Sequence, residues 1–302
     1  MTSHSELLAA LWPYMEERRA QVDAALTEYF PAPARWPKQL HEAANWALFG
    51  GGKRMRPVLA LAAFEAVGGS AKLPWDAVLP AACAVEMVHT YSLVHDDLPC
   101  MDDDAERRGR PTVHVQFSEA LALLAGDALL TEAFSLCGHL EAYKGAAQPE
   151  KILKASRMLA HAAGWQGMVG GQSIDLGFEM PVDDEESLRF LHLRKTGELF
   201  RFSAAVGALL GDASEKDVER MGDYGEALGL AFQISDDILD ADEDNEEREA
   251  SPTPSFPALL GEAGARERCA ALLERCYELL EGYGPKAEPL RQLAWYAVHR
   301  DH

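Results

Sequence analysis

The chain has 302 residues, of which 48% are hydrophobic and 25% charged, and this composition supplies enough apolar side chains for a large globular core. Its 49 acidic residues against 28 basic ones leave a net charge of −21, which excludes nucleic acid and anionic membrane surfaces as natural partners. The five cysteines have no C-x-x-C spacing and no uncharged apolar run reaches 18 residues, so we expect neither a disulfide framework nor a membrane span.

Helical spacing of apolar residues runs through the whole chain, whereas strand signals are weak. The first predicted helix covers about residues 5–30, and its charged, amphipathic sequence is unlike a secretory signal, so we expect a cytoplasmic protein. The segment 118–140 is apolar over much of its circumference, which predicts a central buried helix. Breaks are predicted near residues 31–37, 50–52, 68–74, 144–149, 181–184 and 243–257, and none is long enough to separate two cores. We therefore expect one all-α domain over residues 1–302.

The first functional pattern is "GGGKRMRP", Gly50–Pro57. Lys53 and Arg56 are three residues apart, so on a helix they would face the same way. The preceding glycines would leave backbone N–H groups near a helix start, which favours an anion. A single basic residue is more often a solvated surface group, and only the combination with the acidic clusters suggests a phosphate site.

The second pattern is the acidic run "HDDLPCMDDD", which contains Asp96, Asp97 and Asp102. Pro99 cannot continue a regular helix, and a local bulge would let Asp102 take the place of a residue one turn after Asp96. A second acidic cluster, "SDDILD", places Asp236 and Asp240 four residues apart on one helix face, with Gln233 on the same side. Carboxylate ligands without cysteine indicate Mg²⁺, which is commonly held by a few carboxylates together with substrate phosphates.

Six segments in order, "GGGKRMRP", "VEMVHTYSLVHDDLPCMDDDAERRGRPT", "LAGDALL", "GMVGGQSIDL", "LRKTGELF" and "GLAFQISDDILD", resemble the motifs of the trans-isoprenyl diphosphate synthases. The chain is most similar to bacterial short-chain members of the farnesyl diphosphate synthase type, from about Leu40 to Gly261. The resemblance implies a large all-α bundle around a deep central cavity, a homodimer, and three Mg²⁺ ions per active site. It implies Mg²⁺-dependent ionisation of dimethylallyl or geranyl diphosphate, condensation with isopentenyl diphosphate and loss of a proton.

The resemblance also implies roles for individual residues. The metal ligands would be Asp96, Asp102 and Asp236, supported by Asp97 and Asp240. Isopentenyl diphosphate would be held by Lys53, Arg56, His89 and Arg108. The allylic diphosphate would be held by Arg107 and Lys195, while Thr196 and Gln233 would place oxygens near the carbocation. Tyr91 would limit the cavity below the metals, which favours farnesyl diphosphate as the main product.

One segment departs from the family pattern. Seven of the ten residues from Asp240 to Glu249 are acidic, and Thr253 stands where a lysine of the closing loop is expected, which predicts weaker binding of the allylic diphosphate. The alternatives are a geranylgeranyl or geranyl diphosphate synthase, a class I terpene cyclase, or a non-catalytic helical subunit. The cyclase reading is disfavoured by "DDILD" and by Lys53 and Arg56.

Overall fold

The computed structural model describes residues 4–30, 36–243 and 254–300. The larger helices are α1 (His4–Tyr29), α2 (Lys38–Leu48), α3 (Met55–Ala66), α4 (Leu79–Asp96), α6 (Glu119–Gly138), α7 (Pro149–Ala163), α8 (Met168–Asp175), α9 (Glu185–His192), α10 (Glu198–Leu210), α11 (Glu215–Glu243), α12 (Phe256–Leu279) and α13 (Glu288–His299). The short elements are η1 (Gly69–Ala71), η2 (Trp75–Ala77), β1 (Glu106–Arg107), β2 (Arg110–Pro111), α5 (Val113–Gln116), η3 (Leu140–Tyr143), the π-helical turn η4 (Leu193–Gly197) and η5 (Gly284–Ala287). The two strands pair with each other as a two-residue hairpin. The all-α prediction is confirmed.

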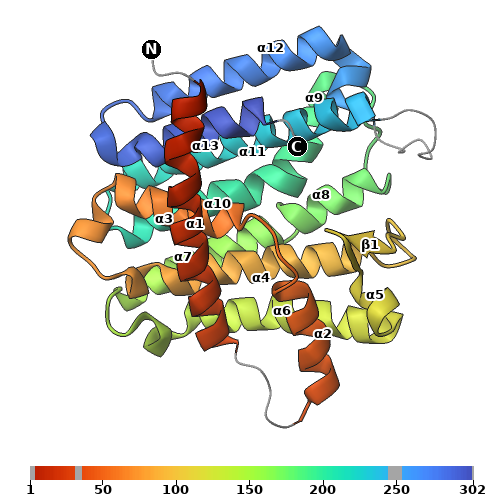
Figure 1. Ribbon diagram of the computed structural model, residues 1–302, viewed down its shortest axis with the longest axis horizontal. Coiled ribbons are helices and arrows are strands. Elements are labelled where there is room, and N and C mark those ends of the chain that lie inside the picture. The colour runs from red at the N-terminus through yellow and green to blue at the C-terminus, as the bar shows by residue number, and fades with distance from the viewer. Residues whose placement is uncertain (1–3, 31–35, 244–253, 301–302) are drawn as a thin grey trace.

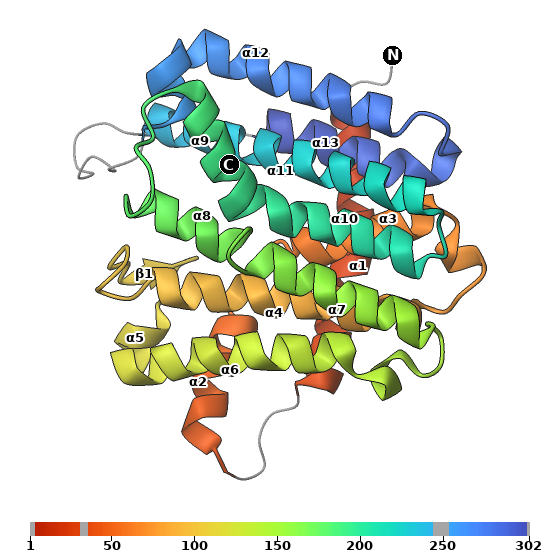
Figure 2. The same cartoon turned by 180° about the vertical axis from the view of Figure 1, so that it is seen from behind.

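Long helices pack side by side in the order α6, α4, α3, α10, α11 and α12, as Figures 1 and 2 show from opposite sides. Helix α1 crosses this stack and contacts α3, α4 and α13. Nearly every residue of α3, α4 and α10 is buried, and Phe64 and Phe200 are among the largest fully buried side chains. These three helices, rather than α6, form the centre of the molecule.

Helix α6 lies at the edge of the stack, so the prediction that it is central and buried is wrong (Figure 1). One face of it packs on α4, while Leu123 and Leu124 are 48% and 52% exposed. The apolar residues of α6 thus form two faces, one that packs against the rest of the protein and one that is exposed. Of the helices that the structure describes, α6 is also the one with the length and apolarity of a membrane span, although helices of non-membrane proteins pass the same test.

Helix starts follow the capping residues of the sequence. The Ser118 hydroxyl accepts a hydrogen bond from the Leu121 N–H at the start of α6, and Asp184 and Ser187 form a capping box at the start of α9. The predicted breaks up to residue 184 coincide with the ends of helices. Residues 244–253, which include the rest of the acidic run, Arg248 and Thr253, lie outside the described residues. The predicted weakening of allylic diphosphate binding by this loop therefore stays a prediction.

Candidate active site

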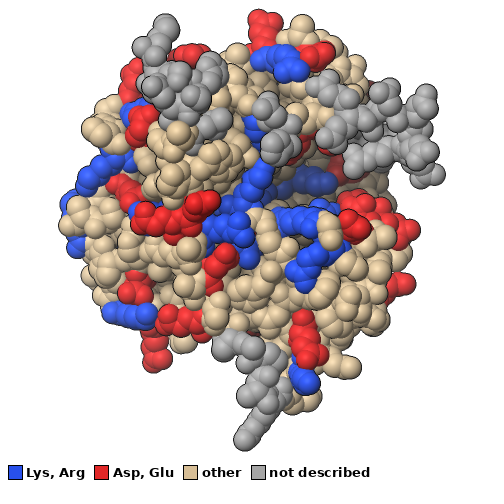
Figure 3. All heavy atoms as spheres, viewed as in Figure 1, with Lys and Arg blue, Asp and Glu red and all other residues tan. Residues whose placement is uncertain are grey.

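A cavity of about 780 Å³ opens where the end of α4 and the last turns of α11 lie on the same side of the molecule. Its wall comes from the loop before α3, from α3, α4, α8, η4, α10 and α11, and from the hairpin residues Arg107 and Arg108. Figure 3 shows Lys and Arg side chains gathered along a hollow across the middle of this face, although the protein as a whole is strongly acidic. The basic character of the hollow is therefore local.

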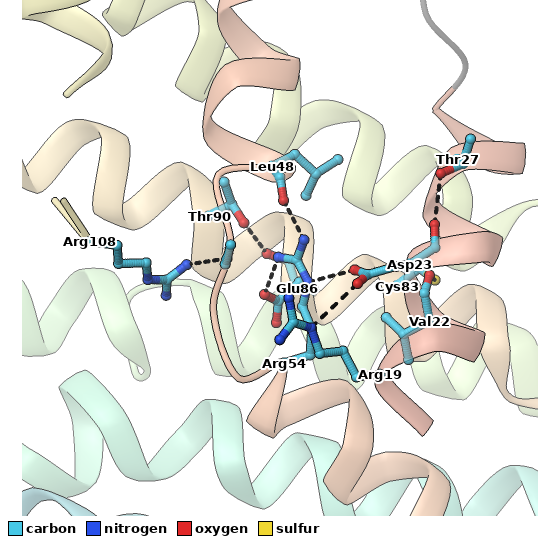
Figure 4. Close-up of polar contacts among 11 residues, drawn as sticks. Arg19, Val22, Asp23, Thr27, Leu48, Arg54, Cys83, Glu86, Thr90 and Arg108 are labelled. Carbon is cyan, nitrogen blue, oxygen red and sulfur yellow. Dashed lines mark hydrogen bonds and ion pairs between the residues drawn. The ribbon is translucent and has the colours of Figure 1, made fainter. Parts of the chain in front are cut away.

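The basic part of the cavity is built on Gly50–Gly52. Gly52 has φ +117°, and a Cβ atom there would lie 2.4 Å from a guanidinium nitrogen of Arg108, so only glycine lets that side chain approach. Arg108 donates a hydrogen bond to the Gly51 carbonyl over 2.6 Å (Figure 4). Burial lowers the pKa of Arg108. This part of the cavity is therefore a partly desolvated cationic surface that lies against the backbone of Gly50–Gly52.

Arg56 lies in the same wall, with its guanidinium carbon 4.8 Å from the centre of the Phe200 ring. Among the described residues it has no ion pair with a carboxylate, and its buried Nε has no hydrogen-bond partner. Burial, together with the charge of Arg108, lowers the Arg56 pKa to about 10. Burial and these same arginines hold the His89 pKa well below 6.5, so this imidazole is neutral at pH 7. In the described part of the chain neither Arg56 nor Arg108 has an ion pair, and the charge of Glu86 offsets only part of theirs, so this wall favours an anion.

Lys53 also lines the cavity, but the structure corrects the predicted helical relation to Arg56. Helix α3 begins only at Met55, and the intervening Arg54 has φ +50°, so Lys53 lies in the preceding loop. Its amine donates a hydrogen bond to the Tyr296 hydroxyl over 2.7 Å. The two cations reach one cavity because of a turn rather than because of helical spacing.

Arg54 borders the same cavity, but its guanidinium is held by protein groups and is structural (Figure 4). Its guanidinium donates to Glu86 over 2.8 Å, to Asp23 over 2.9 Å and to the Leu48 carbonyl over 2.6 Å. The Arg54 side chain is 3% exposed, and so is that of Glu86. This buried pair ties α1, α3 and α4 together beneath the basic wall.

The first acidic cluster follows the end of α4. The helix ends at Asp96 and the chain turns back sharply, so that the Asp102 N–H donates to the Asp96 carbonyl over 2.9 Å, while the Asp102 side chain is exposed. The Asp96 carboxylate faces the cavity, where it accepts a hydrogen bond from the Gln172 amide. Burial raises the Asp96 pKa to about 6, with a smaller contribution from the charge of Asp102. Asp97 is turned away from this cavity toward Arg107.

Helix α9 runs into α10 through η4, which carries Lys195 and Thr196. A π-helical turn inserts one extra residue and is often found at functional sites. The Lys195 amine pairs with Asp175 of α8 over 2.5 Å. Burial opposes the charge of this lysine, but the neighbouring carboxylates outweigh it and its pKa is raised. Gly171 permits the close approach of α8 to η4, because a Cβ atom at this position would lie 2.3 Å from the backbone nitrogen of Lys195.

Thr196 connects η4 to α11. Its hydroxyl donates to Oε1 of Gln233 over 3.1 Å, and the Gln233 amide donates to Asp237 over 3.2 Å. The other Asp237 oxygen accepts the backbone N–H of Phe256, the first residue of α12. This chain of hydrogen bonds fixes the amide of Gln233 at the cavity wall.

The second acidic cluster lies on the last turns of α11, as predicted. Asp236 faces the cavity and Asp240 follows one turn later in an exposed position. The Asp236 carboxylate accepts a hydrogen bond from Arg300 over 2.5 Å. Burial raises the Asp236 pKa, and Arg300 opposes this effect.

The carboxylates fit a hard cation only in combination with a ligand. Among the described residues no three His, Cys, Asp or Glu side chains converge as a ready-made metal site. Asp96 and Asp236 nevertheless face one cavity, and beside Asp96 the buried Oε1 of Gln172 has no hydrogen-bond partner. Oxygen donors that leave most of the coordination sphere open are typical of Mg²⁺ sites completed by substrate phosphates.

Comparison with known proteins decides the family. The polyprenyl synthetase family model matches residues 37–251. The chain belongs to the polyprenyl synthetase family. Geranylgeranyl pyrophosphate synthase 9 of Arabidopsis thaliana, a chloroplastic protein, is 41% identical over 299 residues, which are 95% of this chain and 81% of that one. Farnesyl diphosphate synthase of Geobacillus stearothermophilus is 39% identical over 297 residues, 96% and 97% of the two chains. An FPP/GFPP synthase from Zymomonas mobilis has a similar structure, with a TM-score of 0.85 at 37% identity, covering 96% of this chain and 99% of that one.

This polyprenyl synthetase is therefore an enzyme, a trans-prenyl diphosphate synthase that acts on isoprenoid diphosphates, and its family is in general Mg²⁺-dependent. The relatives are named for both farnesyl and geranylgeranyl products. Family membership thus fixes the class of reaction and leaves the product length to the cavity. In this synthase Tyr91 is 5% exposed and lies edge-on to His95 at 5.6 Å, whereas the neighbouring Ser92 and Leu93 line the cavity.

The structure adds residues that the sequence analysis missed in this synthase. Gln172 and Asp175 belong to the quoted segment "GMVGGQSIDL", but only the packing of α8 against η4 shows that they contact Asp96 and Lys195. Tyr296 comes from the far end of the chain and accepts a hydrogen bond from the cavity residue Lys53, so no local pattern indicates it.

Proposed function

We propose that this synthase condenses isopentenyl diphosphate with dimethylallyl and then geranyl diphosphate and releases mainly farnesyl diphosphate. The observation that carries the proposal is one cavity with two opposed charge sets, Asp96 and Asp236 on one side and Arg56 and Arg108 on the other. One diphosphate can bind through cations held by the carboxylates, and the other directly on the arginines. The whole of residues 1–302 acts as one catalytic domain in this proposal.

The proposed binding roles are those that the family resemblance implies. Arg56, Arg108, Lys53 and neutral His89 hold isopentenyl diphosphate against the glycine loop. Lys195 and Arg107 hold the allylic diphosphate. Asp96 and Asp236 are the principal metal ligands and Asp102, Asp97 and Asp240 support them, with three Mg²⁺ ions per substrate-bound site.

Within the site, the chain's own residues bind, orient and shield the reactants. When bound, Mg²⁺ supplies positive charge that stabilises the departing diphosphate. Lys195 adds a fixed positive charge on the same side, while Thr196 and Gln233 present oxygens beside the developing allylic cation. The apolar wall, with Phe232 and Leu199 among its residues, excludes water that would capture the cation. A proton then leaves the condensed product, and the released diphosphate is the nearest base in this scheme.

The proposed product length depends on Tyr91. It precedes Asp96 by five residues, about 7.5 Å along a helix axis at ~1.5 Å per residue. A growing prenyl chain that passes between α4 and its neighbours would meet this ring. Replacement of the ring by a smaller side chain should let the chain grow further.

We further propose that the enzyme is a homodimer. Leu123 and Leu124 expose an apolar face of α6, and a second copy of the same helix would cover it.

The test is incubation of the purified enzyme and Mg²⁺ with dimethylallyl diphosphate, with and without isopentenyl diphosphate. A synthase forms product only with both substrates, and the product should be mainly farnesyl diphosphate. Mainly geranylgeranyl or geranyl diphosphate would overturn the product assignment. Hydrocarbon or alcohol from the allylic substrate alone would indicate cyclase chemistry.

A further inference from the structure

The end of α13 and the residue that follows it contact two residues of the cavity wall, the basic Lys53 and the acidic Asp236. Tyr296 accepts the hydrogen bond from Lys53, and Arg300 donates to Asp236 over 2.5 Å and to the Phe232 carbonyl over 2.9 Å. Tyr296 and Arg300 are four residues apart, and so lie about one helical turn from each other. The end of the chain is thus joined to the loop before α3 and to α11.

Arg300 is firmly placed. Its side chain is 3% exposed, and its guanidinium carbon lies 3.5 Å from the centre of the Phe232 ring. The ring of Tyr296, one turn earlier, packs edge-on against Trp12 at 5.1 Å and anchors the same turn on its other side. Arg300 is therefore a preorganised cation rather than a frayed terminal side chain.

The two partners differ in access. The Asp236 side chain is 42% exposed and lines the cavity, so a cation entering the cavity can reach it. The guanidinium is buried, and its Nε has no partner among the described residues. A buried guanidinium that loses its carboxylate is strongly destabilised, so Arg300 depends on Asp236 more than the carboxylate depends on it.

We propose that Arg300 is a positioning residue that holds Asp236 in the metal-free enzyme and competes with Mg²⁺ for that carboxylate. The proposal rests on the proposed role of Asp236 as a metal ligand. Arg300 already occupies one carboxylate oxygen, and a second cation within about 4 Å of the guanidinium meets repulsion. Metal binding therefore requires the Arg300–Asp236 contact to loosen, which lowers the metal affinity of the free enzyme and keeps the carboxylate in place until substrate brings the metal.

The experiment is a calorimetric titration of the substrate-free enzyme with MgCl₂, comparing wild type with Arg300→Gln. Glutamine keeps a donor for the Phe232 carbonyl but has no charge. A charge-assisted hydrogen bond corresponds to at least about a tenfold change in an equilibrium constant, so Arg300→Gln should bind Mg²⁺ about tenfold more tightly. Arg300→Lys keeps the charge and should stay close to wild type.

Arg291→Gln is the matched control. Arg291 lies on the same helix, pairs with Glu288 over 3.3 Å and does not line the cavity, so its Mg²⁺ affinity should equal that of wild type. Thermal unfolding provides a second measurement. Without Mg²⁺, Arg300→Gln should be less stable than wild type, and saturating Mg²⁺ should raise its melting temperature by more.

Equal Mg²⁺ affinities in folded wild type and Arg300→Gln would overturn the competition. If Arg300→Gln does not fold, Arg300→Met, whose apolar stem keeps the packing on Phe232, is titrated with the same expectation and the same criterion. Asp236→Asn separates this proposal from the proposed function. Loss of Mg²⁺ binding in Asp236→Asn without a gain in Arg300→Gln overturns the competition alone, whereas unchanged binding in Asp236→Asn overturns the ligand assignment itself.

Discussion

Arg107 donates from Nε to the Asp97 carboxylate over 2.6 Å, and this contact separates two adjacent aspartates. Asp96 faces the large cavity, whereas Asp97 is 4% exposed and faces Arg107 and the hairpin. Neighbouring residues of one motif thus have different surroundings. The contact also ties β1 to the end of α4, next to the proposed diphosphate site.

Asp96→Asn should reduce kcat by about 100-fold or more, because it removes a charge that acts mainly as the diphosphate departs. Asp97→Asn should reduce kcat less and lower the melting temperature, because Arg107 loses its buried partner. Steady-state kinetics at saturating Mg²⁺ compare the two variants, with circular dichroism as the control for folding. Equal losses of kcat would show that the two carboxylates share one role.

Arg56→Met and Arg54→Met form a second pair. Arg56 has no carboxylate partner among the described residues and is buried, so Arg56→Met should leave stability unchanged or raise it, while raising the KM for isopentenyl diphosphate about 10- to 100-fold. Arg54→Met leaves Glu86 buried without its cation and should destabilise the fold by about 3–5 kcal/mol. Thermal unfolding and substrate titration distinguish them. A destabilised Arg56→Met with normal KM would assign that arginine to the fold.

His192 should make stability depend on pH. Burial lowers its pKa to about 4, whereas the unfolded chain has its ordinary value near 6.5. As pH falls from about 6.5 to 4 the unfolded state therefore takes up the proton first, and stability is lost by about 3 kcal/mol across this window. The Asp237 carboxylate lies 3.8 Å from His192 Nε2, and burial raises its pKa to about 6. Its contribution to stability therefore changes with pH in the opposite direction to that of His192.

The measurement for this prediction is thus the difference in unfolding free energy between wild type and His192→Leu from pH 7 to pH 4. Wild type should lose more stability than the variant on acidification. His139→Gln, which changes a 58% exposed side chain, is the control. If the unfolding free energies of wild type and His192→Leu fell in parallel with pH, the pKa of His192 in the folded protein would equal its ordinary value.

Tyr91→Ala should lengthen the main product from farnesyl to geranylgeranyl diphosphate or beyond, because it removes a buried ring from α4 next to the cavity residue Ser92. Tyr91→Phe keeps the ring and should keep the product. Chromatography of the dephosphorylated products gives the chain-length distribution. An unchanged distribution in folded Tyr91→Ala would place the limit of the cavity elsewhere.

The helical class and most breaks could be read from the sequence because capping residues, prolines and glycines act locally. The spacing of apolar residues does not show which helix lies at the centre of the protein. The prediction for α6 was wrong because its apolar residues lie on two faces, of which only one is covered. The position of the aspartates could be predicted because apolar helical sequence precedes both clusters: the first comes at the end of α4 and the second lies in the last turns of α11. The chain of Thr196, Gln233 and Asp237 was only partly predictable, because its geometry depends on the contact between η4 and α11.

The residues that hold the charged side chains in place could not be predicted from local patterns. Gln172 meets Asp96 across 76 positions of sequence, and Arg300 meets Asp236 across 64. Lys53 was assigned to the right cavity by a wrong geometric argument, since it precedes its helix. Long-range packing decides these contacts.

The π-helical turn η4 accommodates one extra residue locally, in the turn that carries Lys195 and Thr196. Helices α9, η4 and α10 form one continuous rod, in which Leu188 and Leu191 of α9 are fully buried and Phe200 of α10 is 1% exposed. A π-helical turn rotates less per residue than an α-helix, so the five residues of η4 cover about the same angle as four α-helical residues. The extra residue therefore leaves Leu188 and Leu191 in phase with Phe200, and the distortion of the backbone is confined to the turn that carries Lys195 and Thr196. Deleting one residue of η4 would keep both apolar faces buried and would remove this local widening, so it would disturb the reactive side chains before it disturbed the fold.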